Sequence, residues 1–251
     1  MDASRVPDAP LRHAFELASA RDAGADEIGF YARQLPAEGP SLDALCGIGR
    51  LLVPLARAGR NVHAVDPSAS AIAICEARLA GHGATASLFR QSLPDLNLPF
   101  RYATAFVAGG ALQRIVDPTH AFAALSRLRA HLLAPATLIV ELAIPPEAQH
   151  PPGAPLVEVR TATDADGAQI AWRSETRVDV DARRVDRNDR FEKREGRRIV
   201  EREDDRSAFT WYLEDEIATL LRSVDFTDVD VIAAPWQCDD GSRRFVAIAR
   251  M

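Results

Sequence analysis

The stretch that decides the fold is SLDALCGIGRLLVPLARAGRNVHAVD, residues 41–66. It opens with a short apolar run that contains the acid Asp43, passes through a turn with Gly47 and Gly49, and continues with leucines at helical spacing. A second short apolar run then ends in another acid, Asp66. The stretch therefore predicts a strand, a tight loop, a helix and a second, parallel strand, with a ligand at the carboxyl ends of the strands.

The residue types in this stretch indicate the chemistry of the ligand. Glycine has no Cβ, so Gly47 and Gly49 allow the backbone to come close to a flat, polar molecule. An acid at the end of the second strand can accept hydrogen bonds from both hydroxyls of a ribose, and such charge-assisted bonds contribute about 1.5–3 kcal/mol each. Asp66 stands at that position. We therefore expect an adenosine-type nucleoside as the ligand.

The loop resembles that of the class I S-adenosylmethionine-dependent methyltransferases. In that family it follows an acid-x-Gly-x-Gly-x-Gly pattern. Asp43, Gly47 and Gly49 fall on this pattern, and Leu45 replaces its first glycine. The resemblance implies S-adenosylmethionine as the cofactor, with Asp66 on its ribose. The cofactor site implied in this way consists of Tyr31, Asp43, Leu45, Cys46, Gly47, Gly49, Asp66, Pro67, Ser92, Leu93, Ala108 and Gly109.

Two other nucleotide-binding loops fit the stretch less well. A dinucleotide-binding loop needs Gly-x-Gly-x-x-Gly, but Leu52 stands three residues after Gly49. The Gly-Lys-Ser/Thr sequence of a phosphate-binding loop does not occur in the chain. A βα turn that merely contains two glycines is the remaining alternative, and the acids before and after the turn argue against it.

Composition and charge narrow the class of protein. The chain has 251 residues, of which 47% are hydrophobic and 26% charged, which suits one α/β domain with an elaboration or two domains. Its net charge of −6 argues against a nucleic acid as partner, because phosphate binding needs concentrated positive charge. Cys46, Cys75 and Cys238 have no paired spacing, so neither a disulfide framework nor a metal site is expected.

The sequence carries no membrane signal. No apolar run approaches the length of a membrane span, and Asp2, Arg5 and Asp8 stand where a signal peptide would be apolar. We therefore expect a cytoplasmic protein without a membrane partner.

The remaining periodicities continue the alternation of strands and helices. Apolar spacing predicts helices over residues 11–20, 26–35, 69–79, 119–133 and from Leu213, and strands over 84–89, 102–107, 136–143 and 243–249. The resemblance covers essentially the whole chain. It implies an α/β fold, namely a Rossmann-like, seven-stranded, mostly parallel sheet with helices on both faces and an antiparallel last strand.

The sequence changes character at Pro145. From there to about residue 211, apolar residues alternate with charged ones, which predicts an antiparallel sheet. We therefore expect a methyltransferase core in residues 1–150 and 212–251, interrupted by an antiparallel β insert in 151–211. The resemblance implies that this insert forms a lid over the substrate or the surface of a homodimer. Its aromatic residues either line an apolar substrate pocket or pin the sheet onto the core: Trp172, Phe209, Trp211 and Tyr212.

Several residues outside the loop have two interpretations each. Arg114, next to Gln113, stands where many relatives have a histidine, and it either holds an anionic substrate or points to solvent. Glu141 interrupts a buried apolar strand, so it is either a substrate contact, the interpretation that we favour, or a structural ion-pair partner. Tyr31 either closes over the methionine end of the cofactor or belongs to a helix packing face. The substrate candidates are Gln113, Arg114, Glu141 and Trp211.

These features together predict methyl transfer from S-adenosylmethionine to a small-molecule acceptor. Because the sulfonium is already reactive, such an enzyme needs no catalytic triad, and we assign no catalytic base. The alternative is a methyltransferase-like binding or assembly module without catalysis, because Leu45, Ser92 and Arg114 all depart from the family pattern. At Ser92 that pattern has an acid on the adenine amino group, and serine offers an uncharged acceptor instead. A nicotinamide-dependent oxidoreductase is disfavoured by Leu52.

Overall fold

A seven-stranded sheet forms the centre of the fold in the computed structural model, which describes residues 8–19, 23–149, 155–236 and 241–251. The strand order is β10-β11-β5-β4-β1-β2-β3. Neighbouring strands are parallel except at β11, which is antiparallel to both β5 and β10. The strands are β1 (Ser41–Ala44), β2 (Val62–Val65), β3 (Ser87–Phe89), β4 (Tyr102–Val107), β5 (Leu132–Ile144), β10 (Asp228–Ala233) and β11 (Arg243–Arg250). The mostly parallel sheet with an antiparallel last strand confirms the predicted fold.

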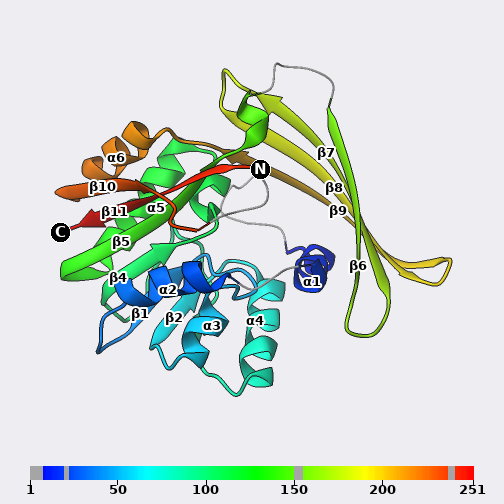
Figure 1. Ribbon diagram of the computed structural model, residues 1–251, viewed down its shortest axis with the longest axis horizontal. Helices are drawn as coiled ribbons and strands as arrows, with labels where there is room; N and C mark the ends of the chain where they lie inside the picture. The colour runs from blue at the N-terminus through cyan, green and yellow to red at the C-terminus, as the bar shows by residue number, and fades with distance from the viewer. Residues whose placement is uncertain (1–7, 20–22, 150–154, 237–240) are drawn as a thin grey trace.

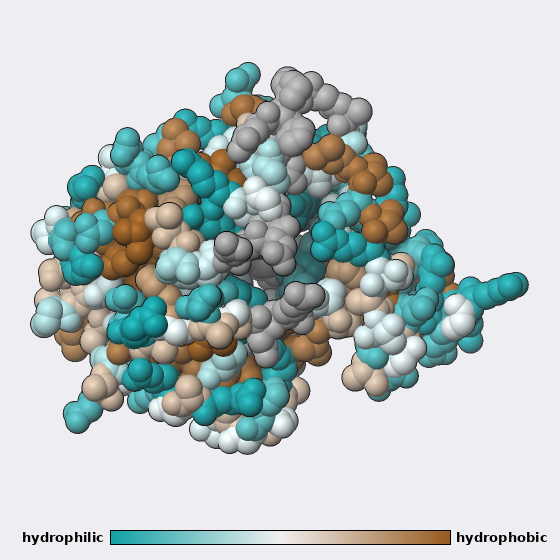
Figure 2. Space-filling model, in the orientation of Figure 1, coloured by the Kyte–Doolittle hydropathy of each residue, from teal (hydrophilic) through white to brown (hydrophobic). Residues whose placement is uncertain are grey.

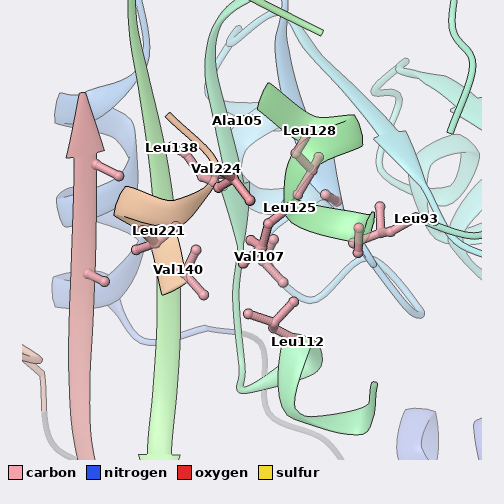
Figure 3. Packing of buried hydrophobic residues seen from close by; sticks show 14 of the residues in the cluster. Leu93, Ala105, Val107, Leu112, Leu125, Leu128, Leu138, Val140, Leu221 and Val224 are labelled. Atoms are coloured by element: carbon pink, nitrogen blue, oxygen red, sulfur yellow. The ribbon is translucent and has the colours of Figure 1, made fainter. Parts of the chain in front are cut away.

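Helices cover both faces of this sheet (Figure 1). One face packs against α2 (Ala25–Gln34), α3 (Leu52–Arg57) and α4 (Ala69–Gly81), and the other against α5 (Pro118–Ala130) and α6 (Glu214–Ser223). Figure 3 shows leucines and valines of α5, α6, β4 and β5 meeting in one of these two apolar layers. Because both faces of the sheet are buried, its central strands are apolar almost throughout. The acids at the ends of these strands therefore stand out from the apolar runs in the sequence.

Capping residues fix where the helices begin. Asp117 precedes α5, and its carboxylate accepts hydrogen bonds from the amides of Thr119 and His120, while Pro118 occupies the first helical turn. Ser68 caps α4 in the same way, because its hydroxyl oxygen accepts from the amide of Ala71. Both caps stand just after strand ends or loops that border the site, so they also fix the loops themselves.

The boundary between α5 and β5 differs from the prediction. We expected a helix to residue 133, but α5 ends at Ala130 and β5 begins at Leu132. His131 closes the helix, since its Nδ1 contacts the carbonyl of Arg127 at 2.7 Å and its Nε2 accepts from the amide of Leu98 at 3.0 Å. Pairing of Leu132 with Tyr102 on β4 then outweighs the helical spacing of the leucines.

The insert forms a second, four-stranded antiparallel sheet, which we call the cap. It consists of β6 (Leu156–Thr163), β7 (Gln169–Asp179), β8 (Arg184–Glu195) and β9 (Arg198–Thr210), paired in that order. The predicted alternation is therefore confirmed. Figure 2 shows hydrophilic residues over most of the outer surface of the cap, with hydrophobic atoms gathered near its upper end. The large apolar side chains of β6 are all exposed, namely Leu156, Val157 and Val159.

Helix α1 (Pro10–Ser19) lies between the core and the cap (Figure 1). Leu11 and Phe15 are buried in an apolar cluster with Ile170 and Phe191 of the cap. The ring of Phe15 lies 5.7 Å from the rings of both Trp172 and Phe191. Trp172 therefore packs under α1, where it helps to hold this helix on the cap.

Candidate active site

A cavity of about 860 Å³ lies between the carboxyl ends of the central strands and the cap. Its wall includes the loop after β1, the loop after β2 and the loop after β4. On the opposite side it includes part of α1 and residues 205–208 of β9. The cavity is therefore at the edge of the sheet where open α/β folds bind ligands.

Most of the residues expected from sequence lie in this wall. They are Asp43, Leu45, Cys46, Gly47, Asp66, Pro67, Ser92, Leu93, Ala108, Gly109 and Arg114. Asp43 and Asp66, at the ends of neighbouring strands, share one cavity, and Leu45 lines that cavity without filling it. The residues expected at the site that do not line the cavity are Tyr31, Gly49, Gln113, Glu141 and Trp211.

The loop after β1 has an unusual backbone. Leu45, Gly47 and Gly49 all have positive φ, at 65°, 54° and 80°. Glycine adopts this conformation freely, whereas at Leu45 it costs about 1–2 kcal/mol because the side chain crowds the backbone. The amides of Leu45 and Cys46 both donate to the carbonyl of Val65, at 2.8 and 3.1 Å. These bonds hold Leu45 in the conformation for which the family pattern uses glycine.

Gly49 serves helix packing rather than the cavity wall. A Cβ at this position would lie 2.6 Å from the Sγ of Cys75 and 3.1 Å from the Cγ2 of Val53. The first distance is too short for a real side chain and the second is tight, so glycine is what lets α3 and α4 pack closely behind the loop. Gly49 itself does not line the cavity.

The two acids are buried and differ in their partners. Burial raises the pKa of Asp43 to about 8, an effect that the nearby positive charge of Arg50 opposes. Burial also raises the pKa of Asp66, but the amides of Ser68 and Gly47, each 2.9 Å from a carboxylate oxygen, counteract it. Within the described residues no hydrogen bond to the Asp43 carboxylate is formed. Asp43 is thus a buried acid that a positively charged ligand group would stabilise.

Arg50 brings a positive charge to the same end of the cavity. Its two terminal nitrogens each donate to a carboxylate oxygen of Glu27 at 2.6 Å. Glu27 comes from α2 and is buried, and its carboxylate holds the guanidinium in a fixed orientation. Hydrogen bonding to Glu27 keeps the pKa of Arg50 above its usual value although burial acts in the opposite direction.

Glu141 does not line the cavity, and its contacts favour the interpretation as a structural ion-pair partner over that as a substrate contact. Its side chain is fully buried in β5. One carboxylate oxygen accepts from the amide of Gly109 at 2.7 Å and from the hydroxyl of Tyr31 at 3.3 Å. The other accepts from Nη1 of Arg244 on β11 at 2.9 Å. Glu141 therefore ties the loop after β4 to α2 and β11, and Gly109 carries this link to the cavity wall.

Tyr31 likewise belongs to the packing face of α2. Its side chain is fully buried, with its ring 5.0 Å from that of Phe106 and 5.4 Å from that of Phe30. It does not line the cavity, so the interpretation in which it closes over the cofactor is not supported by its position.

Gln113 and Trp211 also have structural positions. The Gln113 side-chain nitrogen donates to the carbonyls of Ala143 and Thr210, and its oxygen accepts from the amide of Ala143, all at 2.8 Å. These bonds pin the 3₁₀ helix η1 (Ala111–Arg114) between β5 and β9. Trp211 is 5% exposed and packs in the core cluster that contains α6. Neither residue lines the cavity, and both lie where the cap joins the core.

Ser92 has a carboxylate close to it. Its hydroxyl donates to Asp95 at 2.7 Å, and Ser92 and Leu93 both line the cavity. Asp95 is exposed. An acid therefore stands three residues after the position where the family pattern has one.

Sequence reasoning missed the roof of the cavity. It is formed by Arg12, His13 and Glu16 of α1 together with residues 205–208 of β9. Arg12 donates to Asp205 at 2.9 Å, which joins α1 to the cap. The sequence shows only that Arg12 and Glu16 lie on one face of a predicted helix. It does not show that this face of α1 covers a site formed by residues 30 or more positions later in the chain.

The same helix is joined to the core by His13. Because Arg12 has only donor groups, its contact with Nε2 of His13 makes that nitrogen the acceptor. Nδ1 of His13 therefore carries the proton and donates to the hydroxyl of Ser70 at 2.7 Å, and Ser70 donates to Asp8. Burial lowers the pKa of His13 to about 4, and the Arg12 charge adds to this effect. His13 is thus neutral near pH 7 and acts as a hydrogen-bonding link.

Residues 42–134 match a family described as "Methyltransferase domain". The matched segment runs from β1 to the start of β5 and includes the loops after β1, β2 and β4. The match therefore covers the part of the chain that forms the cofactor side of the cavity in this fold. No match to the chain was found among curated protein sequences.

Solved structures share the fold of this methyltransferase domain together with its cap. An S-adenosylmethionine-dependent methyltransferase from Clostridium acetobutylicum is 17% identical, with a TM-score of 0.74 over 94% of this chain and 95% of its own. The CcbJ methyltransferase from Streptomyces caelestis is 18% identical, with a TM-score of 0.72 over 95% and 97%. An S-adenosylmethionine-bound amino pentose methyltransferase from Micromonospora echinaspora is 17% identical, with a TM-score of 0.69 over 98% and 99%.

None of the helices in the described residues is long and apolar enough to cross a membrane. Over the same ranges, His, Cys, Asp and Glu side chains form no group of three or more that could hold a metal ion.

Proposed function

We propose that this protein transfers a methyl group from S-adenosylmethionine to a small-molecule acceptor. The observation that carries the proposal is the position of Asp43 and Asp66, which stand at the ends of adjacent parallel strands in the wall of one cavity. The cavity volume of about 860 Å³ lies toward the upper end of the range of about 300–1,000 Å³ that is usual for ligand sites. That leaves room for a second ligand beside a nucleoside.

The charges of the site fit the parts of this cofactor. Asp66 would accept from the ribose hydroxyls through the lone pairs that Gly47 and Ser68 leave free. Asp43 would bind the ammonium group of the methionine portion, which relieves the cost of its buried charge. Arg50, oriented by Glu27, would bind the carboxylate of the same portion.

The other end of the cofactor would lie along two further loops. Ser92 and Leu93 would contact the adenine, and Asp95 would supply the negative charge that Ser92 lacks. Ala108 and Gly109 would border the methyl group, with Gly109 held in place by Glu141. Leu45, Cys46 and Pro67 would enclose the cofactor from the β1 and β2 sides.

For this reaction the protein mainly has to align the acceptor atom with the methyl carbon and the sulfur of the donor. S-adenosylmethionine supplies a methyl carbon bound to a positively charged sulfur. In the transfer, a lone pair of the acceptor forms the bond to that carbon, the carbon–sulfur bond breaks toward sulfur, and the acceptor loses a proton to solvent. The walls of the cavity hold the two reactants in line, and positioning alone can supply effective molarities of about 10⁵–10⁸ M.

Binding and turnover test the proposal separately. The intact protein is titrated with S-adenosylhomocysteine by calorimetry, and formation of the same product from S-adenosylmethionine is followed with amines, phenols and carboxylates as acceptors. Binding together with turnover supports a methyltransferase. Undetectable binding rejects the proposal, and binding without turnover of any acceptor favours the non-catalytic module instead.

We further infer that the free edge of the cap joins two copies of the chain. In antiparallel pairing of β6 with its counterpart about Val159, Glu158 of each copy would face Arg160 of the other. The exposed Val157 and Val159 would be covered in such a pair. Analytical ultracentrifugation of the protein and of Val159→Lys tests this. A dimer that the substitution dissociates supports the inference, and a monomeric wild-type protein contradicts it.

The expected cytoplasmic location stays a prediction. Cys46 and Cys75 are free thiols, as in proteins of reducing compartments.

A further inference from the structure

Arg114 differs in its partners from most of the arginines of the cavity wall. Arg114 is exposed at the cavity, and within the described ranges no carboxylate binds its guanidinium. Three further arginines of the wall each contact an acid: Arg12 with Asp205 at 2.9 Å, Arg50 with Glu27 at 2.6 Å and Arg184 with Asp186 at 2.8 Å.

Arg206 also lines the cavity without such a contact. It neighbours Asp205, whose side chain points toward α1 and its Arg12. Because successive side chains of a strand point to opposite faces, the Arg206 side chain leaves the cap on the face away from α1. Of these two arginines, Arg114 is therefore the one that directs a charge between core and cap.

The backbone that carries Arg114 is held firmly. The adjacent Gln113 makes three hydrogen bonds of 2.8 Å to β5 and β9, so η1 cannot shift without breaking them. Arg114 therefore projects from an anchored turn where the core meets the cap. A guanidinium carried on such a backbone and bound by no carboxylate is suited to planar, bidentate recognition of an oxyanion.

The charges around Arg114 leave positive charge unbalanced. Arg12 and Arg187 act on it as like charges, and Glu16 and Asp205 as opposite charges. Asp205 is bound to Arg12, and Glu16 lies only 3.7 Å from the same Arg12. Arg187 adds a buried Nε atom that has no hydrogen-bond partner. A ligand oxyanion beside Arg114 would supply the missing negative charge.

We propose that the methyl acceptor carries an anionic group, a carboxylate or a phosphate, and that Arg114 binds this group. The proposal rests on the proposed methyl transfer and names the class of its substrate. Arg114 would set specificity: its pairing with the oxyanion fixes one end of the acceptor and leaves the nucleophilic atom free to reach the methyl group.

Matched pairs of acceptors test this on the full-length protein. Amino- and hydroxy-substituted carboxylic acids are compared with their carboxamides, and phosphate monoesters with their parent alcohols. Binding to the protein saturated with S-adenosylhomocysteine is measured by calorimetry, and methyl transfer by mass spectrometry. We expect acids to bind and react, and their neutral counterparts to do so about tenfold or more weakly. Preference within the carboxylate series or within the phosphate series identifies the anion.

Three variants connect the preference to the residue. Arg114→Gln should raise the KM or Kd for the acids by about tenfold or more and leave the affinity for S-adenosylhomocysteine unchanged. Glu16→Gln should lower the same constants, because it removes an opposing negative charge. Arg190→Gln is the matched control, since Arg190 is an exposed arginine of the cap that pairs with Asp204 outside the cavity.

The outcomes separate this proposal from the proposed function. If S-adenosylhomocysteine does not bind, the methyl transfer is rejected, and the anion preference is still measured on the unliganded protein. If neutral acceptors bind as well as the acids do, or if Arg114→Gln behaves like Arg190→Gln, the anionic acceptor is rejected while the methyl transfer stands.

Discussion

The carboxylate of Asp66 accepts a hydrogen bond from the amide of Gly47 at 2.9 Å, so the loops that follow β1 and β2 hold each other in place. The second oxygen of Asp66 accepts from the amide of Ser68, also at 2.9 Å. One side chain thus shapes the β1 loop, orients the start of α4 and presents its remaining lone pairs to the cavity. The acid at the end of β2 is part of the loop structure as well as a candidate ligand contact.

We predict that Asp66→Ala lowers the affinity for S-adenosylhomocysteine by at least about tenfold, because it removes a contact of roughly 1.5–3 kcal/mol and frees the Gly47 amide. Calorimetry measures this directly. Asp66→Asn is the matched control, since it keeps a hydrogen-bond acceptor but loses the charge. Its affinity for S-adenosylhomocysteine should lie between those of the wild type and of Asp66→Ala. Wild-type affinity in Asp66→Ala would remove the basis of the cofactor assignment.

The pKa of Asp43 predicts how binding and stability depend on pH. Burial raises this pKa from 3.8 to about 8, so the folded protein holds a proton that the unfolded chain releases. The stabilisation from Asp43 is therefore fully present below pH 3.8 and is lost as the pH rises through about 8. Asp43→Asn removes this dependence, so its stability relative to the wild type should increase with pH over that window in urea unfolding.

Ligand binding should show the opposite trend. If the ionised Asp43 binds the ammonium group, the affinity for S-adenosylhomocysteine should rise with pH up to about 8, by up to about tenfold per unit. Calorimetry at several pH values below 8 in Asp43→Asn should show weak binding without this slope. A wild-type affinity that does not change with pH would contradict the assignment of the ammonium group to Asp43.

Sequence patterns predicted the sheet because each strand can be recognised from residues that are close together in the chain. Apolar runs that end in Asp43 and Asp66 marked two strand ends, and the same residues line the cavity. Glu141 could not be resolved in this way, because its partners Tyr31 and Arg244 lie 110 and 103 residues away. A buried carboxylate in a sequence shows that a partner must exist, but the partner's identity depends on how distant strands pair.

The roof of the cavity was beyond sequence reasoning for a related reason. The amide of Leu11 donates to Glu203, which lies 192 residues later in the chain. Helical spacing predicts that α1 exists, and period-two spacing predicts β9, but neither indicates that the two meet. Gln113 gives the same lesson, since its partner Thr210 lies 97 residues later, in the last strand of the cap.

We predict that Gly49→Ala destabilises the protein by about 2–5 kcal/mol. The new Cβ would lie 2.6 Å from the Sγ of Cys75, and overpacking of this kind costs about 1–3 kcal/mol beyond the 1–2 kcal/mol of a left-handed backbone. Gly47→Ala is the control, because its Cβ meets no atom within 4 Å and only the backbone cost applies. Urea unfolding of both variants measures the difference.

A double variant isolates the packing contribution in that prediction. Cys75→Ala removes the sulfur that the new Cβ would meet, so Gly49→Ala should cost less in a Cys75→Ala background than in the wild type. Equal costs in the two backgrounds would show that Cys75 does not limit this position.

Glu141→Gln should destabilise the fold by about 3–5 kcal/mol, since it replaces a fully buried carboxylate that pairs with Arg244 by a neutral amide. Glu201→Gln, on the exposed part of β9, should change stability by less than about 0.5 kcal/mol. Both are measured by urea unfolding. A Glu141→Gln variant with wild-type stability but reduced turnover would restore the interpretation of Glu141 as a substrate contact.

The last prediction concerns the hydrogen bonds that join the β9 strand of the cap to the first residues of α1. Glu203 accepts from the amides of Leu11 and Arg12, at 2.9 and 3.1 Å, so its carboxylate caps the positive end of this helix. Glu203→Ala should therefore lower the protection of these amides from hydrogen exchange by about twofold to thirtyfold. This range corresponds to the loss of about 0.5–2 kcal/mol that is usual when a helix loses the side chain that accepts from its first amides. Glu201→Ala, on the same strand, should leave their exchange unchanged. Because α1 forms part of the roof, S-adenosylhomocysteine should also dissociate faster from Glu203→Ala, and an unchanged dissociation rate would show that this helix does not retain the ligand.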